Sequence, residues 1–154
     1  PSFDVNTIEP VVSNIQRRKM SKLKIEVDFK TGLEKRLGGD EGRYGVALLQ
    51  TVNELEGTYG NLNDPLMTDK IAYKKQEAYE ELRQYALYQS NSKAKNPNAQ
   101  SSVKIASSAT EFSENIEKGE YQAGDVVQYT DANGQLQLFV YTGIKGSDIV
   151  VGIN

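Results

Sequence analysis

Four groups of residues are of types that could take part in chemistry: a glycine-rich turn, an acidic loop, a row of glutamates and a basic segment. The chain contains neither histidine nor cysteine among its 154 residues. It therefore lacks the commonest general base, any thiol nucleophile and two of the commonest metal ligands. Catalysis by a Ser–His or Cys–His pair within this chain is excluded.

The glycine-rich turn, at 38–42, reads Gly-Gly-Asp-Glu-Gly. A phosphate-binding loop ends in Gly-Lys-Ser/Thr, so that backbone amides and the lysine face the phosphate. Here Asp40 and Glu41 stand where the phosphate would lie. We interpret the turn as the entry to a helix, with Asp40 as its N-cap.

The acidic loop begins with Asp131 and Asn133, a spacing that also opens calcium-binding loops. Gly134 comes earlier than the sixth position that such a loop requires, and Thr142 occupies the place of the bidentate glutamate. The segment between two β-rich runs is more typical of a hairpin turn. We predict a hairpin and no metal site.

The glutamates Glu77, Glu80 and Glu81 could in principle supply the paired carboxylates of a glycoside hydrolase. Basic residues are interspersed with them, which is typical of a solvated helix face with local ion pairs. These are Lys70, Lys74, Lys75 and Arg83. We therefore predict a protein that is not an enzyme and has no cofactor.

The basic segment, residues 15–38, has eight Lys or Arg against three acidic residues, a net charge of +5. Residues 101–154 have three Lys against seven acids, a net charge of −4. No aromatic residue interrupts the cluster Arg17, Arg18 and Lys19. We favour docking on an acidic protein surface; the alternatives are nucleic-acid binding that weakens with salt and a plain solvated face.

The N-terminal region, 1–38, is predicted to be an arm followed by an assembly strand. Residues 1–20 show no clear period, and Glu9-Pro10 disfavours a helix, so we expect an extended arm anchored by residues such as Phe3, or else a frayed terminus. Residues 22–30 alternate between apolar and charged, as a half-buried strand does. Its apolar residues are Leu23, Ile25, Val27 and Phe29. Such a strand must pair with the C-terminal sheet or with a neighbouring subunit.

The middle region, 39–90, is predicted to be a helical hairpin. Apolar residues at three- and four-residue spacing indicate a helix that ends near Gly57 or Gly60. Asp64-Pro65 is a strong start signal for a second helix, to about Ser90. Three tyrosines lie off its apolar stripe and are either ordinary surface residues or contacts for a partner: Tyr73, Tyr79 and Tyr88.

A polar stretch at 91–102 is predicted to be a linker, and 103–154 a small antiparallel β-rich module. The module begins with a capping box, Ser108-x-x-Glu111, and we expect a hairpin around Asp131–Gly134 and a last strand near the end. At its size the module needs the rest of the chain or a partner for stability. The fold class expected for the whole chain is α+β.

The order of a short helix, the run AGDVVQYTD, a glycine-containing turn and the run LFVYTG resembles small β modules in tailed-phage virion proteins. Capsid decoration proteins and head-fibre or tail-fibre adaptors contain such units. The likeness covers about a third of the chain. It implies a short auxiliary or connector-type subunit rather than a long fibre, because the chain has no shaft repeats. The resemblance identifies no catalytic or ligand residue.

From these observations we expect a structural protein of a tailed-phage virion, made in the host cytoplasm, with other capsid or connector subunits as partners. We also expect a homo-oligomer. No run of roughly 20 apolar residues predicts a membrane span, and no signal peptide is recognisable. One alternative is a cytoplasmic nucleic-acid-binding or regulatory protein that uses 15–38. Another is a carbohydrate- or protein-binding module with Tyr121, Tyr129 and Tyr141 as contacts.

Overall fold

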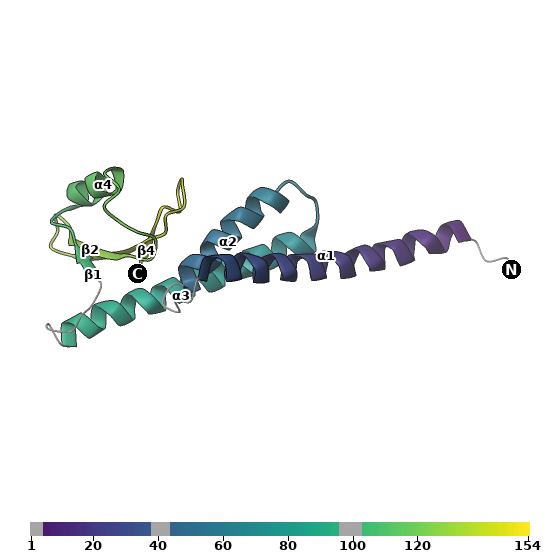
Figure 1. Ribbon diagram of the computed structural model, residues 1–154, viewed down its shortest axis with the longest axis horizontal. Coiled ribbons are helices and arrows are strands. Elements are labelled where there is room, and N and C mark those ends of the chain that lie inside the picture. Colours follow the sequence, from purple (N-terminus) through teal and green to yellow (C-terminus); the bar gives the residue numbers. More distant parts are fainter. Residues whose placement is uncertain (1–4, 38–43, 96–102) are drawn as a thin grey trace.

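The computed structural model describes residues 5–37, 44–95 and 103–154, and the side chains of 13–37, 44–91 and 103–154. Three helices are followed by a small sheet with a fourth helix against it (Figure 1). The α+β class is confirmed. The elements are α1 (Val5–Leu37), α2 (Tyr44–Tyr59), α3 (Pro65–Lys95), β1 (Val103–Ile105), α4 (Ala109–Glu117), β2 (Val126–Thr130), β3 (Leu136–Tyr141) and β4 (Val150–Ile153).

The predicted helical hairpin is confirmed by α2 and α3. The Asp64-Pro65 start signal acts as expected, since the Leu66 amide donates a hydrogen bond to Asp64 Oδ1 at 3.1 Å. Buried apolar residues of both helices, such as Leu48 and Leu82, form the centre of the main core. α1 and one face of the C-terminal sheet pack on this hairpin.

The predicted strand at 22–30 is wrong, because this segment is part of the 33-residue helix α1. Ile25 and Phe29 are only 2% and 4% exposed, whereas Leu23 and Val27 are 63% and 58% exposed. A strand would place all four side chains on one face, but a helix separates them into two pairs four residues apart. A helix also satisfies its own backbone hydrogen bonds, so this segment needs no partner strand.

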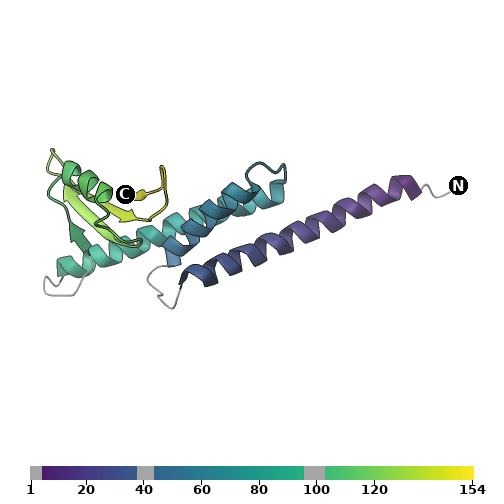
Figure 2. The ribbon, with the colours of Figure 1, turned by 45° about the horizontal axis from the view of Figure 1, so that its top comes forward.

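The predicted extended arm is also wrong over its described part, because α1 begins at Val5 and continues through Pro10. Proline lacks an amide hydrogen, so Pro10, the sixth residue of α1, removes the bond that an amide there would donate to the Asn6 carbonyl, and the helix continues past this single loss. Phe3 lies outside the described residues. Figure 2 shows the N-terminal half of α1 extending away from α2 and α3.

The C-terminal half of α1 packs closely on α2. A Cβ atom added at Gly32 would lie 2.5 Å from Thr51 Cγ2, so only glycine permits this approach of the two helices. One turn later, Arg36 Nη2 forms an ion pair with Glu54 Oε2 at 2.6 Å, and Arg36 Nη1 also donates to Thr51 Oγ1 at 3.3 Å. The ion pair, which is the main cause, lowers the pKa of Glu54.

The sheet has the strand order β1-β2-β3-β4 and is mixed rather than purely antiparallel, which corrects the prediction. β1 runs parallel to β2 because α4 forms the crossover between them, whereas β2–β3 and β3–β4 are antiparallel. Ser108 caps α4 as predicted, with the Glu111 amide donating to Ser108 Oγ at 3.1 Å, but the Glu111 carboxylate accepts from the Ser107 amide, at 3.3 Å, and not from that of Ser108. The hairpin is confirmed, with Gly134 in the left-handed region at φ 78°.

The two faces of the sheet belong to different clusters. One face contributes Val126 and Val140 to the same core as Leu82 of α3, so sheet and hairpin share one core. The other face packs with α4 in an aromatic cluster that includes Phe112. The predicted linker begins later than expected, because α3 continues to Lys95, two residues before Pro97, and 96–102 lie outside the described residues.

Replacing Phe29 with alanine is expected to lower the free energy of unfolding by about 3–5 kcal/mol, because it empties a buried aromatic site between helices. Val27→Ala, two residues away, is expected to change it by less than about 0.5 kcal/mol, because Val27 is exposed. Urea unfolding of both variants measures the difference. Equal losses for the two variants would favour the strand and contradict the helix.

Candidate docking surface

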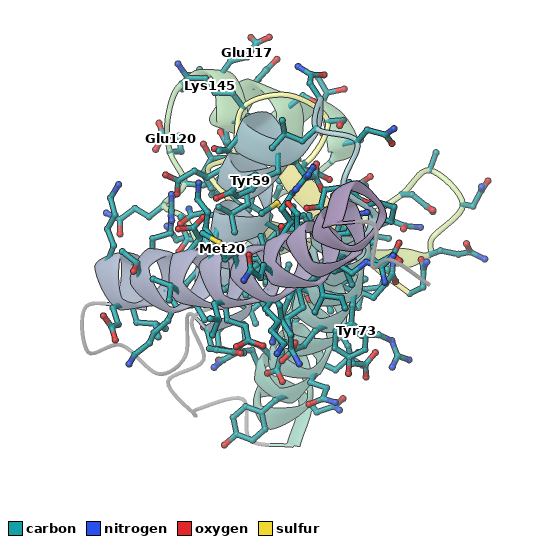
Figure 3. All side chains as sticks on the ribbon, turned by 90° about the vertical axis from the view of Figure 1, so that its right-hand side faces the viewer. Met20, Tyr59, Tyr73, Glu117, Glu120 and Lys145 are labelled. Atoms are coloured by element: carbon teal, nitrogen blue, oxygen red, sulfur yellow. The ribbon has the colours of Figure 1, made fainter. Side chains whose placement is uncertain are left out.

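The outer surface of α1 carries three large apolar side chains in water. Met20, Leu23 and Val27 are 68%, 63% and 58% exposed. Their spacing of three and four residues places them along one side of the helix, opposite Ile25 and Phe29. We call these three residues the outer stripe. Figure 3 shows Met20 among the side chains that α1 presents to its surroundings.

Exposed basic residues border the outer stripe. Lys19, Lys24 and Lys30 lie beside it, with Glu26 as an exposed acid nearby. An exposed apolar row with a mainly positive border is typical of a helix that binds an acidic, amphipathic partner surface. The outer stripe is therefore the candidate docking surface.

Some of the predicted docking residues of the basic segment are exposed, and others are buried. Arg17, Arg18 and Lys19 are all exposed on α1, as are Leu23 and Val27 of the outer stripe. Ile25 and Phe29 are corrected to core residues, because they pack against the chain's own helices. The period-2 pattern does not distinguish the buried residues from the exposed ones. The four-residue spacing of Ile25 and Phe29 is the helical signal that could have done so.

The three predicted contact tyrosines of α3 also differ in exposure. Tyr73 and Tyr88 are 69% and 68% exposed, so they remain candidates for contacts with a partner. Tyr79 packs against the chain's own core, and its hydroxyl donates to Asp148 Oδ1 at 3.1 Å. Burial, the largest cause, and the Asp148 carboxylate raise the pKa of Tyr79. Tyr79 is therefore corrected to a residue that joins α3 to the sheet.

The tyrosines of the β module lie in an aromatic cluster. Tyr121 is buried and stacks edge-on against Phe112, with 5.8 Å between ring centroids. Tyr129 lies parallel to Phe139 at 5.6 Å, and Tyr141 is 6.0 Å from Tyr121. These contacts engage all three rings in the aromatic cluster, with Tyr121 buried and Tyr129 and Tyr141 partly exposed.

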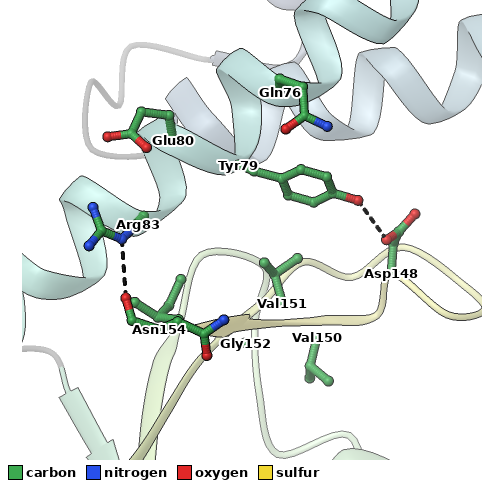
Figure 4. A pocket seen from close by; sticks show the side chains of 10 residues that line it. Gln76, Tyr79, Glu80, Arg83, Asp148, Val150, Val151, Gly152 and Asn154 are labelled. Carbon is green, nitrogen blue, oxygen red and sulfur yellow. Dashed lines mark hydrogen bonds between the residues drawn. The ribbon is translucent and has the colours of Figure 1, made fainter.

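A groove of about 550 Å³ lies between α3 and β4 (Figure 4). Tyr79 and Arg83 of α3 border it on one side, and the strand borders it on the other. Arg83 Nε donates to the main-chain oxygen of Asn154 at 3.1 Å. The lining is mixed in charge, with Glu80 and Asp148 opposing Arg83, so it is not a deep pocket with converging acids.

A second hollow, of about 360 Å³, lies between α1 and α2. Within it the Tyr59 hydroxyl donates a hydrogen bond to Asp28 Oδ2, and Lys24 lies over the Tyr59 ring at 5.6 Å. Burial of the phenol, followed by its bond to Asp28, raises the pKa of Tyr59 to about 12. This contact joins the middle of α1 to the end of α2.

The carboxylates have structural partners. Asp131 accepts hydrogen bonds from the amides of Gln135 and Asn133, at 2.8 and 2.9 Å. The bond from Gln135, the largest cause, and one from the Gln137 side chain lower the pKa of Asp131. Its oxygens thus stabilise the hairpin turn. Among the residues that the structure describes, no group of three acids lies close enough together to hold a metal ion. None of the described helices combines the length and apolarity needed to cross a membrane.

No family model, curated protein or solved structure was found to match this chain. The assignment of function therefore depends on the chain's own residues.

Raising the pH from about 10 to 12 is expected to destabilise the protein, in part through Tyr59. Its folded-state pKa lies above the ordinary value, so the stabilisation is complete below pH 10 and is lost as the pH rises through 12. The free energy of unfolding that is lost in this way is about 3 kcal/mol at most. Tyr59→Phe is expected to flatten this part of a plot of unfolding free energy against pH, whereas Tyr73→Phe, at an exposed site, is expected to leave it unchanged.

Proposed function

We propose that this chain is a non-enzymatic structural protein of a larger assembly, and that it docks on a neighbouring subunit through α1. The observation that carries the proposal is the exposure of the outer stripe. Burying a Met, Leu or Val side chain contributes about 1.5–3 kcal/mol, so three such residues offer a substantial driving force for association. Lys19 lies beside the outer stripe, and Arg17 and Arg18 are exposed on other sides of the same helix.

The proposed partner surface is acidic and apolar. The basic segment has a net charge of +5, so a second copy of α1 lying alongside would be repelled. A surface with acids around an apolar centre satisfies both the lysines and the outer stripe. Exposed Tyr73 and Tyr88 on α3 are proposed as further contacts, because tyrosine buries a large apolar area at low conformational cost.

The assembly that we propose is the virion of a tailed phage, with the chain as an auxiliary, decoration or connector-type subunit. The support is the resemblance of the C-terminal module to small virion modules, together with the unpartnered apolar side of α1. The neighbouring subunits would be capsid or connector proteins, and the chain would be made in the host cytoplasm before assembly. Repetition of the same contact by symmetry would strengthen individually weak docking.

The alternative of nucleic-acid binding has the charge of α1 in its favour. Successive residues of a helix turn by 100°, which places Arg17, Arg18 and Lys19 on three different sides. In a helix that follows a phosphate backbone, the basic residues instead lie on one face. Filter binding to duplex DNA in 50 and 200 mM salt tests this alternative. A steep loss of affinity between the two would favour it over docking on protein.

The proposed function is tested by measuring whether the protein co-sediments with particles purified from its source. We expect it to co-sediment with a large particle. We expect the double variant Leu23→Glu/Val27→Glu to lose most of this association, because two charges would have to be buried in the interface. Both positions are exposed in the free chain, so the variant should remain folded.

Leu136→Glu is the matched control, because Leu136 is 57% exposed but lies on β3. It is expected to co-sediment like the unmodified protein. A protein that sediments alone, or a double variant that still associates fully, would contradict docking through the outer stripe.

A further inference from the structure

Strand β4 forms an open edge of the sheet. It pairs with β3 alone among the strands of the described chain. The Thr142 amide donates to the Ile149 carbonyl at 2.9 Å, which fixes the alternation of the antiparallel ladder. Val151 therefore directs its backbone amide and carbonyl toward β3, whereas Val150 and Gly152 direct theirs toward the open side.

The β4 edge has neither a charged side chain nor a proline to protect it against pairing. Residues 150–153 include no charged side chain and no proline. The opposite edge, β1, has only three residues and carries Lys104, which pairs with Asp125 at 2.9 Å. Natural sheets protect their edges with short strands, lysines and prolines. By this criterion β1 is protected and β4 is available.

We propose that β4 pairs with β4 of a second copy of this chain, antiparallel and about a two-fold axis at Val151. Such an interface is isologous, because each copy contributes the same strand. The pairing satisfies the outward amides and carbonyls of Val150 and Gly152 in both copies. It joins the two sheets into one continuous sheet of twice the width.

The side chains on this edge are complementary to themselves. An axis at Val151 places Val150 of one copy opposite Gly152 of the other. A Cβ atom at Gly152 would lie 3.5 Å from Phe139 Cε1, so the glycine leaves open space beside that ring. Val150 of the partner lies directly across from this glycine, so its side chain reaches over Gly152 toward the Phe139 ring.

The charges at the ends of the edge are complementary as well. Asp148 lies in the turn before β4 and Asn154 directly follows the strand, so the same axis brings the Asp148 end of one copy to the Asn154 end of the other. Arg83 lies at Asn154, where its Nε atom donates to the main-chain oxygen, and its side chain is exposed. Asp148 uses Oδ1 for Tyr79, which leaves Oδ2 for the partner's Arg83. The two-fold axis produces this pair twice.

The groove between α3 and β4 provides the space for the added strand (Figure 4). A two-fold axis normal to the sheet keeps both α3 helices on the same side of it. Gln76 and Glu80 of α3, both exposed, then form a polar rim around the paired strands. A central backbone pairing with a polar rim is the usual arrangement of a specific interface.

Sedimentation-velocity ultracentrifugation of the full chain, from micromolar to millimolar concentration, tests the proposal. We expect a monomer–dimer equilibrium. Gly152→Pro is expected to raise the dimer dissociation constant by at least about tenfold, because proline removes an amide that faces the partner and not β3. A thermal melt should show that the variant is folded.

Ile105→Pro is the matched control at the other edge. The Ala106 amide donates to the Gln128 carbonyl, so the amide of Ile105 faces away from β2, as that of Gly152 faces away from β3. This variant is expected to dimerise normally. Equal weakening by both prolines would show a general effect on the sheet and would overturn the proposal.

A charge reversal provides a second test, which does not depend on proline. Arg83→Glu is expected to weaken the dimer, and Arg83→Glu combined with Asp148→Arg is expected to restore it, because the pair is reformed with opposite signs. A monomer at every concentration would overturn the proposal. So would a dimer that Leu23→Glu dissociates and Gly152→Pro does not, since that dimer would belong to α1. None of these outcomes tests the proposed docking of α1 on another subunit, which the co-sedimentation experiment tests independently.

Discussion

The packing of one half of α1 on the helical hairpin determines much of the surface of this protein. Ile25 and Phe29 are buried, and Gly32 allows contact with Thr51 of α2. With 33 residues, α1 is about 50 Å long, roughly twice the length of the 16-residue α2. A helix that outreaches its neighbour must leave side chains uncovered. The outer stripe is a consequence of the side from which α2 and α3 approach, because it lies opposite the buried Ile25 and Phe29.

A shared core makes the sheet part of the same body as the helices. Val126 and Val140 pack in one cluster with Leu82, and Tyr79 and Arg83 bind the end of the sheet from α3. A small four-stranded sheet buries too little surface to be stable alone, so α3 supplies the missing half of its core. The arrangement separates the two surfaces that we propose for association, α1 at one end of the molecule and the β4 edge at the other (Figure 1).

Local signals predicted the elements whose ends are fixed by local hydrogen bonds. Asp64-Pro65 began α3, Ser108 and Glu111 capped α4, and the hairpin turn formed at Asp131. Residues 22–30 were misassigned because their alternation fits a strand, while Ile25 and Phe29 fit a helix equally well. Over nine residues the two periods overlap, and lysine, leucine and glutamate have good helix propensity. The parallel β1 was missed because three residues give no readable pattern.

The sequence by itself determined the charge asymmetry, the absence of imidazole and thiol chemistry, the helical hairpin and the α+β class. These follow from composition and from contacts between near neighbours in the chain. Only the tertiary structure decided which apolar residues of α1 are core and which form the outer stripe. It also decided that Tyr79 joins α3 to the sheet and that β4 is an open edge. Burial and strand order depend on residues far apart in sequence, which no local pattern records.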